Sequence, residues 1–86
     1  MQDRKKEFKK LLGNLIREKR SEANKSISLV SDEIDLSKSV WFEIENGNRD
    51  PQITTMWRIS EALNIPLSEF IKGIENKIGT NYFIDN

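Results

Sequence analysis

Apolar residues recur every three or four positions along most of this chain, which is the spacing of one face of an α-helix. In the first such segment, residues 4–22, the apolar positions surround Gly13. Glycine inside a helix costs about 1 kcal/mol relative to alanine, so we expect a neighbouring helix to approach the backbone closely there. Asn24 follows the last turn and tolerates the left-handed conformation that commonly ends a helix.

Four further segments with helical spacing follow, separated by short turns: residues 27–34, 38–46, 53–63 and 67–77. Ser26 or Ser28 is placed to cap the second helix, and Ser37 to cap the third. The pattern predicts an all-α fold in which five short helices form one compact domain over residues 1–78. The predicted core residues are Leu12, Leu15, Ile16, Val30, Ile34, Trp41, Ile44, Ile53, Met56, Ile59 and Leu63.

The composition excludes several classes of function. The 86 residues include neither cysteine nor histidine, which removes disulfides, thiolate chemistry, zinc sites and the commonest general base. We predict no metal, cofactor or small-molecule ligand, and no nucleophile–base pair indicates an enzyme. No run approaches the roughly 18 apolar residues that span a bilayer, and the charged N-terminus lacks the apolar core of a signal peptide. We therefore expect a cytoplasmic protein.

The charged residues are unevenly distributed, although the net charge is zero. Residues 1–25 contain nine basic and four acidic side chains, a net charge of +5, and residues 26–86 carry −5. A basic N-terminal third is compatible with a polyanionic partner, although charge counting alone favours an ordinary solvated helix face.

The second and third predicted helices are joined by about three residues, Asp35 to Ser37. This is the spacing of a helix-turn-helix, in which the second helix enters the major groove of DNA. Many small helical domains contain a similar corner, so the spacing alone leaves DNA binding open.

The residues around this corner carry a more specific signal. Ser26 stands at a cap position, Ser31 at a small-residue position, and Leu36 and Ser37 at the turn and the next cap. The longer motifs are "LIREKR", "WFEIENG" and "RDPQITTMWRISEALNIPLSEF". With them, residues 9–71 resemble the Cro and λ-repressor type helix-turn-helix proteins, the XRE family. The chain departs from that pattern at Ile27, where glutamine is frequent, and at Asp35, where glycine is frequent.

The resemblance implies a five-helix λ-repressor-like domain that binds double-stranded DNA as a transcriptional regulator, typically a repressor. It assigns base contacts to Lys38, Ser39 and Glu43 on the third helix, with Trp41 in the core. Lys38 is suited to guanine or phosphate, and Glu43 to the amino group of cytosine. Phe42 has two open alternatives: it packs near the fourth helix, or it contacts thymine methyls and sugars.

The resemblance also implies phosphate contacts at both ends of the corner. The candidates are Lys25, Ser26, Ser28, Asn48 and Arg49. Such contacts position a protein on DNA but do not read its sequence. A further implication is structural: Arg20 is expected to form a partly buried ion pair with Glu45 that fixes the first helix to the third.

Members of this family commonly bind DNA as dimers on paired half-sites. Apolar residues beyond the predicted core lie in the fifth helix and the tail, residues 79–86; they are Phe70, Ile74, Ile78, Tyr82, Phe83 and Ile84. We expect these to form a homodimer contact, with residues 81–85 as a candidate strand; the alternative is that the tail folds back on its own domain or stays loose. The rival function is a protein-interaction module, antitoxin-like or coactivator-like, which the neutral charge and Glu43 favour.

Overall fold

The computed structural model describes residues 3–84. This part of the chain contains five helices: α1 Arg4–Glu22, α2 Ile27–Glu33, α3 Lys38–Glu45, α4 Ile53–Leu63 and α5 Leu67–Ile78. The predicted all-α fold is therefore confirmed, and the expected helix ends differ by one residue at most, the usual uncertainty of a helix terminus. None of the helices in residues 3–84 is long and apolar enough to cross a membrane.

The helix ends follow from local hydrogen bonding. The Ser26 hydroxyl accepts from the backbone N–H of Leu29 at 3.1 Å, and the Ser37 hydroxyl accepts from Val40 at 3.2 Å. These contacts satisfy N–H groups that have no partner within the helix. The turns after α1, α2, α3 and α4 each contain a left-handed residue; these are Asn24, Asp35, Gly47 and Asn64. The aspartate at 35 thus adopts the conformation for which glycine is the frequent choice.

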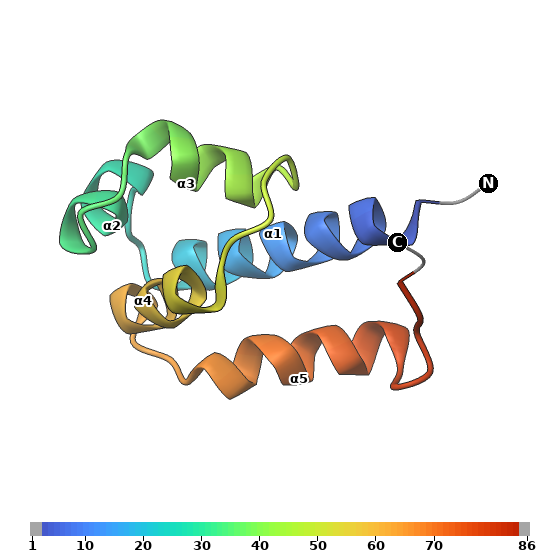
Figure 1. The fold of residues 1–86 in the computed structure, drawn as a ribbon. Coiled ribbons are helices and arrows are strands. Elements are labelled where there is room, and N and C mark those ends of the chain that lie inside the picture. Colours follow the sequence, from blue (N-terminus) through green and yellow to red (C-terminus); the bar gives the residue numbers. More distant parts are fainter. Residues whose placement is uncertain (1–2, 85–86) are drawn as a thin grey trace.

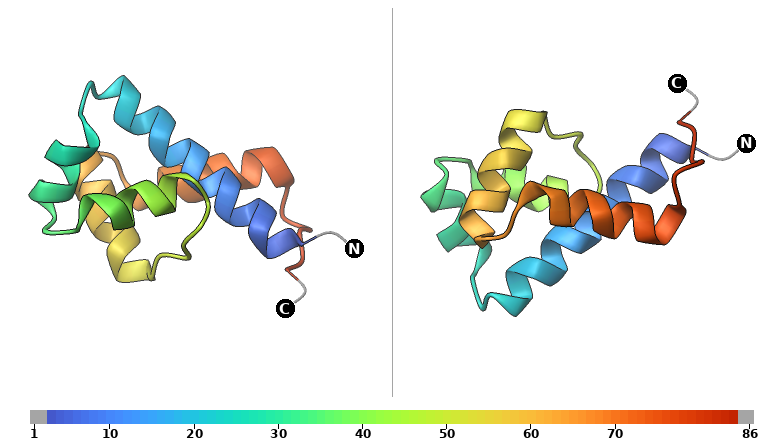
Figure 2. Two further views of the ribbon diagram at one scale, coloured as in Figure 1. Left: turned by 90° about the horizontal axis from the view of Figure 1, so that it is seen from above. Right: turned by 90° about the horizontal axis from the view of Figure 1, so that it is seen from below.

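The long helix α1 runs through the middle of the molecule, between α3 on one side and α5 on the other (Figure 1). The shorter helices α2, α3 and α4 gather around the C-terminal half of α1, as the views from above and below show (Figure 2). Gly13 lies where α1 meets α3: an added Cβ there would be 2.4 Å from the carbonyl oxygen of Glu45 and 2.5 Å from that of Ile44. The close approach expected at this glycine is therefore present.

The core lies between α1 and the other four helices. Its buried apolar residues are Leu12, Leu15, Ile16, Val30, Ile34, Trp41, Ile44, Met56, Ile59, Ala62, Leu63, Phe70 and Ile74. The prediction for Ile53 was wrong, because this first residue of α4 is 67% exposed. Ile53 shares the outer face of α4 with Trp57, one helical turn away, whereas the inner face begins at Met56. The residues Phe70 and Ile74, assigned to a dimer contact, are buried in the core of the same chain.

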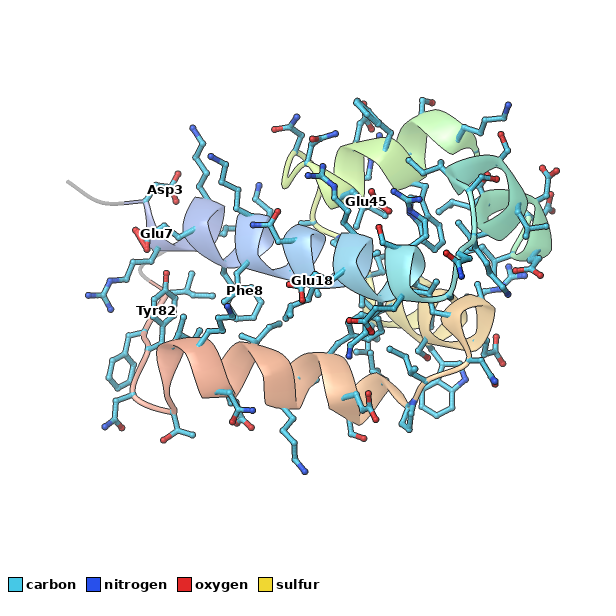
Figure 3. All side chains as sticks on the ribbon, turned by 180° about the vertical axis from the view of Figure 1, so that it is seen from behind. Asp3, Glu7, Phe8, Glu18, Glu45 and Tyr82 are labelled. Atoms are coloured by element: carbon cyan, nitrogen blue, oxygen red, sulfur yellow. The ribbon has the colours of Figure 1, made fainter. Side chains whose placement is uncertain are left out.

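The tail returns to its own domain over the described residues. Tyr82 donates its hydroxyl hydrogen to the backbone oxygen of Arg4 at 2.9 Å, and its ring centroid lies 6.5 Å from that of Phe8 (Figure 3). Residues 79–84 form no strand within this chain, and strand pairing between two copies stays a prediction. Residues 85–86 of the predicted segment lie outside the described residues.

Candidate nucleic-acid interface

The corner between α2 and α3 is closed by a buried serine. Ser31 is fully buried, and its hydroxyl donates to the backbone oxygen of Ile27 at 2.7 Å. Its own carbonyl accepts from the N–H of Leu36 at 2.9 Å, which fixes the turn. The buried side chain and this backbone hydrogen bond together fix the path of the chain from α2 into the turn before α3.

Trp41 orients α3. Its side chain has no solvent-exposed surface, and the indole N–H donates to a carboxylate oxygen of Glu45 at 2.6 Å, one turn along the helix. An indole that is both packed and hydrogen-bonded fixes the rotation of the helix about its axis. The exposed residues of α3 are consequently Lys38, Ser39 and Phe42, with Glu43 partly exposed beside them.

Phe42 has 57% of its surface exposed, and Trp57 on α4 is 59% exposed. The structure therefore does not bury Phe42 at the α4 junction, which was one of its two expected roles. An exposed aromatic side chain on a short helix leaves apolar surface available to a partner.

Glu45 is the centre of the contact between α1 and α3 (Figure 3). Its carboxylate accepts from Nε of Arg20 at 2.6 Å and from Nη2 of the same guanidinium at 3.0 Å, so the structure brings this expected pair together. Arg17 adds a second basic group, with its Nε 3.5 Å from a carboxylate oxygen of Glu45. Sequence reasoning missed Arg17, although its position one turn before Arg20 on α1 was a usable signal.

The environment of Glu45 lowers its pKa. Burial of the carboxylate acts to raise the pKa, but the hydrogen bonds from Arg20 and Trp41 and the charges of Arg20 and Arg17 together outweigh it. The pKa of Glu45 therefore lies below its ordinary value, and the group is ionised at neutral pH. A buried carboxylate with this many donors is a structural element of the corner rather than a free acid.

The phosphate-contact candidates differ in their exposure and in whether they already have a partner within the chain. Ser28 and Asn48 are exposed, and Ser26 is exposed although its hydroxyl caps α2. Arg49 is exposed and paired: its Nη2 lies 2.8 Å and its Nε 2.9 Å from one oxygen of Glu43.

Lys25 is engaged within the domain. Its ammonium donates to the backbone oxygen of Ala62, in the last turn of α4, at 2.8 Å, and to the carboxylate of Glu33 at 3.1 Å. The ammonium of Lys25, which was expected to contact a DNA phosphate, thus links the start of α2 to the end of α4. Local sequence could not reveal this, because the accepting carbonyl lies 37 positions away along the chain.

No metal-binding arrangement accompanies this surface. Within residues 3–84, no three acidic side chains are placed to hold a metal ion together. What the site offers is a short helix with a fixed rotation, an exposed face of mixed polarity, and hydroxyl, amide and guanidinium groups at its two ends.

Comparison with known proteins shows which family this chain belongs to. Residues 13–76, more than half of the chain, match the family model described as a helix-turn-helix domain. The chain belongs to this helix-turn-helix family. A curated relative, the HTH-type transcriptional regulator SutR of Escherichia coli (strain K12), is 29% identical over 62 residues, or 72% of this chain. The aligned segment spans 35% of the length of that relative.

A solved structure shares the fold of this helix-turn-helix chain. The crystal structure of the clp gene regulator ClgR from C. glutamicum matches with a TM-score of 0.76, covering 80% of this chain and 88% of that one. The sequence identity is 14%, so the likeness concerns the fold alone. The corner formed by α2 and α3 is thus the helix-turn-helix, and α3 occupies the position of its second helix.

Proposed function

We propose that this helix-turn-helix domain is a sequence-specific transcriptional regulator, acting as a repressor, that reads the major groove of double-stranded DNA with α3. The observation that carries the proposal is the rotation of α3: Trp41 is fully buried, and Lys38 and Ser39 are exposed on the free face. A helix held in this way presents its first turns to base edges. The curated relative and the solved structure described above are both named as regulators, which agrees with this function.

Three side chains form the proposed base-reading surface. Lys38 donates to guanine O6 or N7, and Ser39 donates or accepts according to its partner. Phe42, at 57% exposure, contacts the methyl group of thymine. Ser26, Ser28 and Asn48 bind the flanking phosphates, and Arg49 does so through Nη1, which lies outside its two close contacts with Glu43. Lys25 is left out of this set because its single ammonium is held by both Ala62 and Glu33.

Selection of bound sequences from random duplex DNA tests the proposal. We expect a palindromic motif for the parent and, for Lys38→Ala, loss of preference at one position of each half-site, worth about 1–3 kcal/mol of discrimination. Lys72→Ala is the matched control, because it removes the same charge from an exposed position on α5, away from α3. Absence of enrichment by the parent at low salt would contradict the proposal.

We also propose that the chain acts as a homodimer through α5 and the C-terminal tail. With Phe70 and Ile74 buried in the core, the remaining exposed apolar residues there are Ile71, Phe83 and Ile84, at 44%, 72% and 46% exposure. A symmetric pair of chains would suit DNA that carries two half-sites, as dimeric helix-turn-helix proteins do.

Sedimentation measures the assembly directly. At micromolar concentration we expect a dimer for the full chain and a monomer for a chain ending at Gly79. Phe83→Glu should also give a monomer while leaving the Tyr82 contact with α1 in place. Equal monomer masses for all three proteins would exclude this dimer contact.

A second function, a protein-interaction module of the antitoxin or coactivator kind, is favoured by one observation. Ile53 and Trp57 lie one turn apart on the outer face of α4 and are 67% and 59% exposed. Salt dependence separates the two functions. DNA affinity falls steeply as the salt concentration rises, with a logarithmic slope of about −0.9 per phosphate contact. The affinity of an apolar contact with a protein changes little with salt.

A further inference from the structure

A second ion pair involving α3 lies on the exposed side of the helix, opposite the Trp41 side. The guanidinium of Arg49 donates a hydrogen bond through Nε to one oxygen of Glu43 at 2.9 Å, and its Nη2 lies 2.8 Å from the same oxygen. The two side chains are 49% and 44% exposed. The pair is therefore charge-neutral, accessible, and placed at the C-terminal half of the proposed reading helix.

The fold does not depend on this pair. Exposed ion pairs contribute about 0–1 kcal/mol to stability. The turn after α3 is already held by its backbone: the N–H of Asn48 donates to the carbonyl of Glu43 at 2.9 Å, and that of Gly47 to Ile44 at 3.1 Å. The side-chain amide of Asn46 also donates to the backbone carbonyl of Phe42 at 2.8 Å. What the pair changes is the charge of the surface beside α3.

We propose that Glu43 determines specificity by acting on Arg49 rather than on a base. The carboxylate holds the guanidinium in a neutral pair, and this restraint lowers the attraction of the surface for any DNA phosphate. The inference rests on the proposed DNA-binding function and assigns Glu43 a positioning role within it. It differs from the cytosine contact expected for Glu43, because the carboxylate already engages Arg49 through a hydrogen bond from Nε and a close contact with Nη2.

Glu43 affects the complex with the correct DNA sequence and the complex with an unrelated sequence differently. When α3 makes its base contacts on the correct sequence, those contacts place a phosphate beside Nη1 of Arg49. The contacts of Glu43 with Nε and Nη2 then stay intact. On an unrelated sequence no base contact fixes this alignment, so a phosphate approaches Arg49 from other directions and competes with Glu43 for the guanidinium. Glu43 thus weakens unrelated complexes more than the correct one, which is discrimination by a repulsive element.

The test measures affinity of the full chain for two duplexes by fluorescence anisotropy at several salt concentrations: the selected sequence and a scrambled one of equal length. The proteins are the parent, Glu43→Gln, Arg49→Gln and the double variant. The matched control is Glu33→Gln, which removes the same charge from an ion pair with Lys25 at 3.1 Å. Glutamine keeps the size of the side chain and removes the charge.

We expect Glu43→Gln to bind the scrambled duplex about five- to tenfold more tightly, with a logarithmic salt slope steeper by about 0.9, as one added phosphate contact requires. Affinity for the selected duplex should rise by less, so the specificity ratio falls. The gain should vanish in the Arg49→Gln background, and Glu33→Gln should stay within about twofold of the parent.

Three outcomes would overturn the inference while leaving DNA binding intact. A change in base preference at one position, with the scrambled duplex unaffected, would show that Glu43 reads a base. A gain that persists without Arg49, or that Glu33→Gln reproduces, would show a general charge effect. A loss of unfolding free energy well above about 1 kcal/mol in Glu43→Gln would show a structural role. Failure of the parent to bind any duplex at low salt would instead overturn the proposed function and this inference together.

Discussion

Replacing Arg20 with methionine is expected to lower the free energy of unfolding by about 3–5 kcal/mol at pH 7, the usual cost of removing one partner of a buried ion pair. Glu45 is 2% exposed, and both of its oxygens accept from Arg20, at 2.6 and 3.0 Å. Without the guanidinium, the carboxylate stays buried with the Trp41 indole and the more distant Arg17. Urea denaturation measures the change.

The matched control is Lys19→Met, which removes the neighbouring positive charge from α1. Lys19 pairs with Glu22 at 3.6 Å on the surface, so its loss should cost less than about 1 kcal/mol. Adding Glu45→Gln to Arg20→Met should recover part of the lost stability, since a neutral amide is less costly to bury than an unpaired carboxylate. Equal losses for the two single variants would contradict the central role of the Arg20–Glu45 pair.

The same pair determines a pH dependence. The pKa of Glu45 in the folded chain lies below its ordinary value, despite burial, because of hydrogen bonds from Arg20 and Trp41 and the charges of Arg20 and Arg17. The ionised form therefore contributes stability above the ordinary carboxyl pKa, and that contribution is lost as the pH falls through the lowered pKa. Arg20→Met removes part of this lowering while burial remains, so its stability should fall less between neutral and acidic pH than that of the parent.

Replacing Gly13 with alanine is expected to lower the free energy of unfolding by about 3 kcal/mol, because the added methyl group overpacks a rigid contact. The new Cβ would stand 2.4 and 2.5 Å from two carbonyl oxygens of α3. Both obstacles are backbone atoms, so α1 and α3 must separate. The direction is informative, since glycine to alanine inside a helix otherwise gains about 1 kcal/mol.

Gly73→Ala in α5 is the control for helix propensity. Its added Cβ would lie 3.3 Å from Cδ1 of Leu15, the end of a side chain rather than a backbone atom, so a small shift of that group relieves the contact. We expect this variant to remain within about 1 kcal/mol of the parent. Thermal denaturation of both variants decides the point: a stability gain for Gly13→Ala would show that α1 and α3 are less closely packed than the structure indicates.

Local chemistry explains why the sequence predicted most of the fold. Helix boundaries depend on caps and on residues a turn apart, and the serine caps at 26 and 37 and the left-handed positions at 24 and 64 can all be read locally. The burial of Trp41 followed from helical spacing together with the family resemblance. Gly13 was equally readable, because a glycine amid helical apolar positions has a cost that close packing offsets.

The sequence by itself determined which segments are helical, where they turn and that α2 and α3 form a helix-turn-helix corner. The tertiary structure decided which apolar faces are covered: Ile53 is exposed, while Phe70 and Ile74 complete the core. It also decided the partners of the charges, tying Lys25 to a carbonyl of α4 and Arg49 to Glu43. The physical reason is range: helices arise from interactions within one turn, whereas burial and ion pairing depend on residues that only the packed chain brings together.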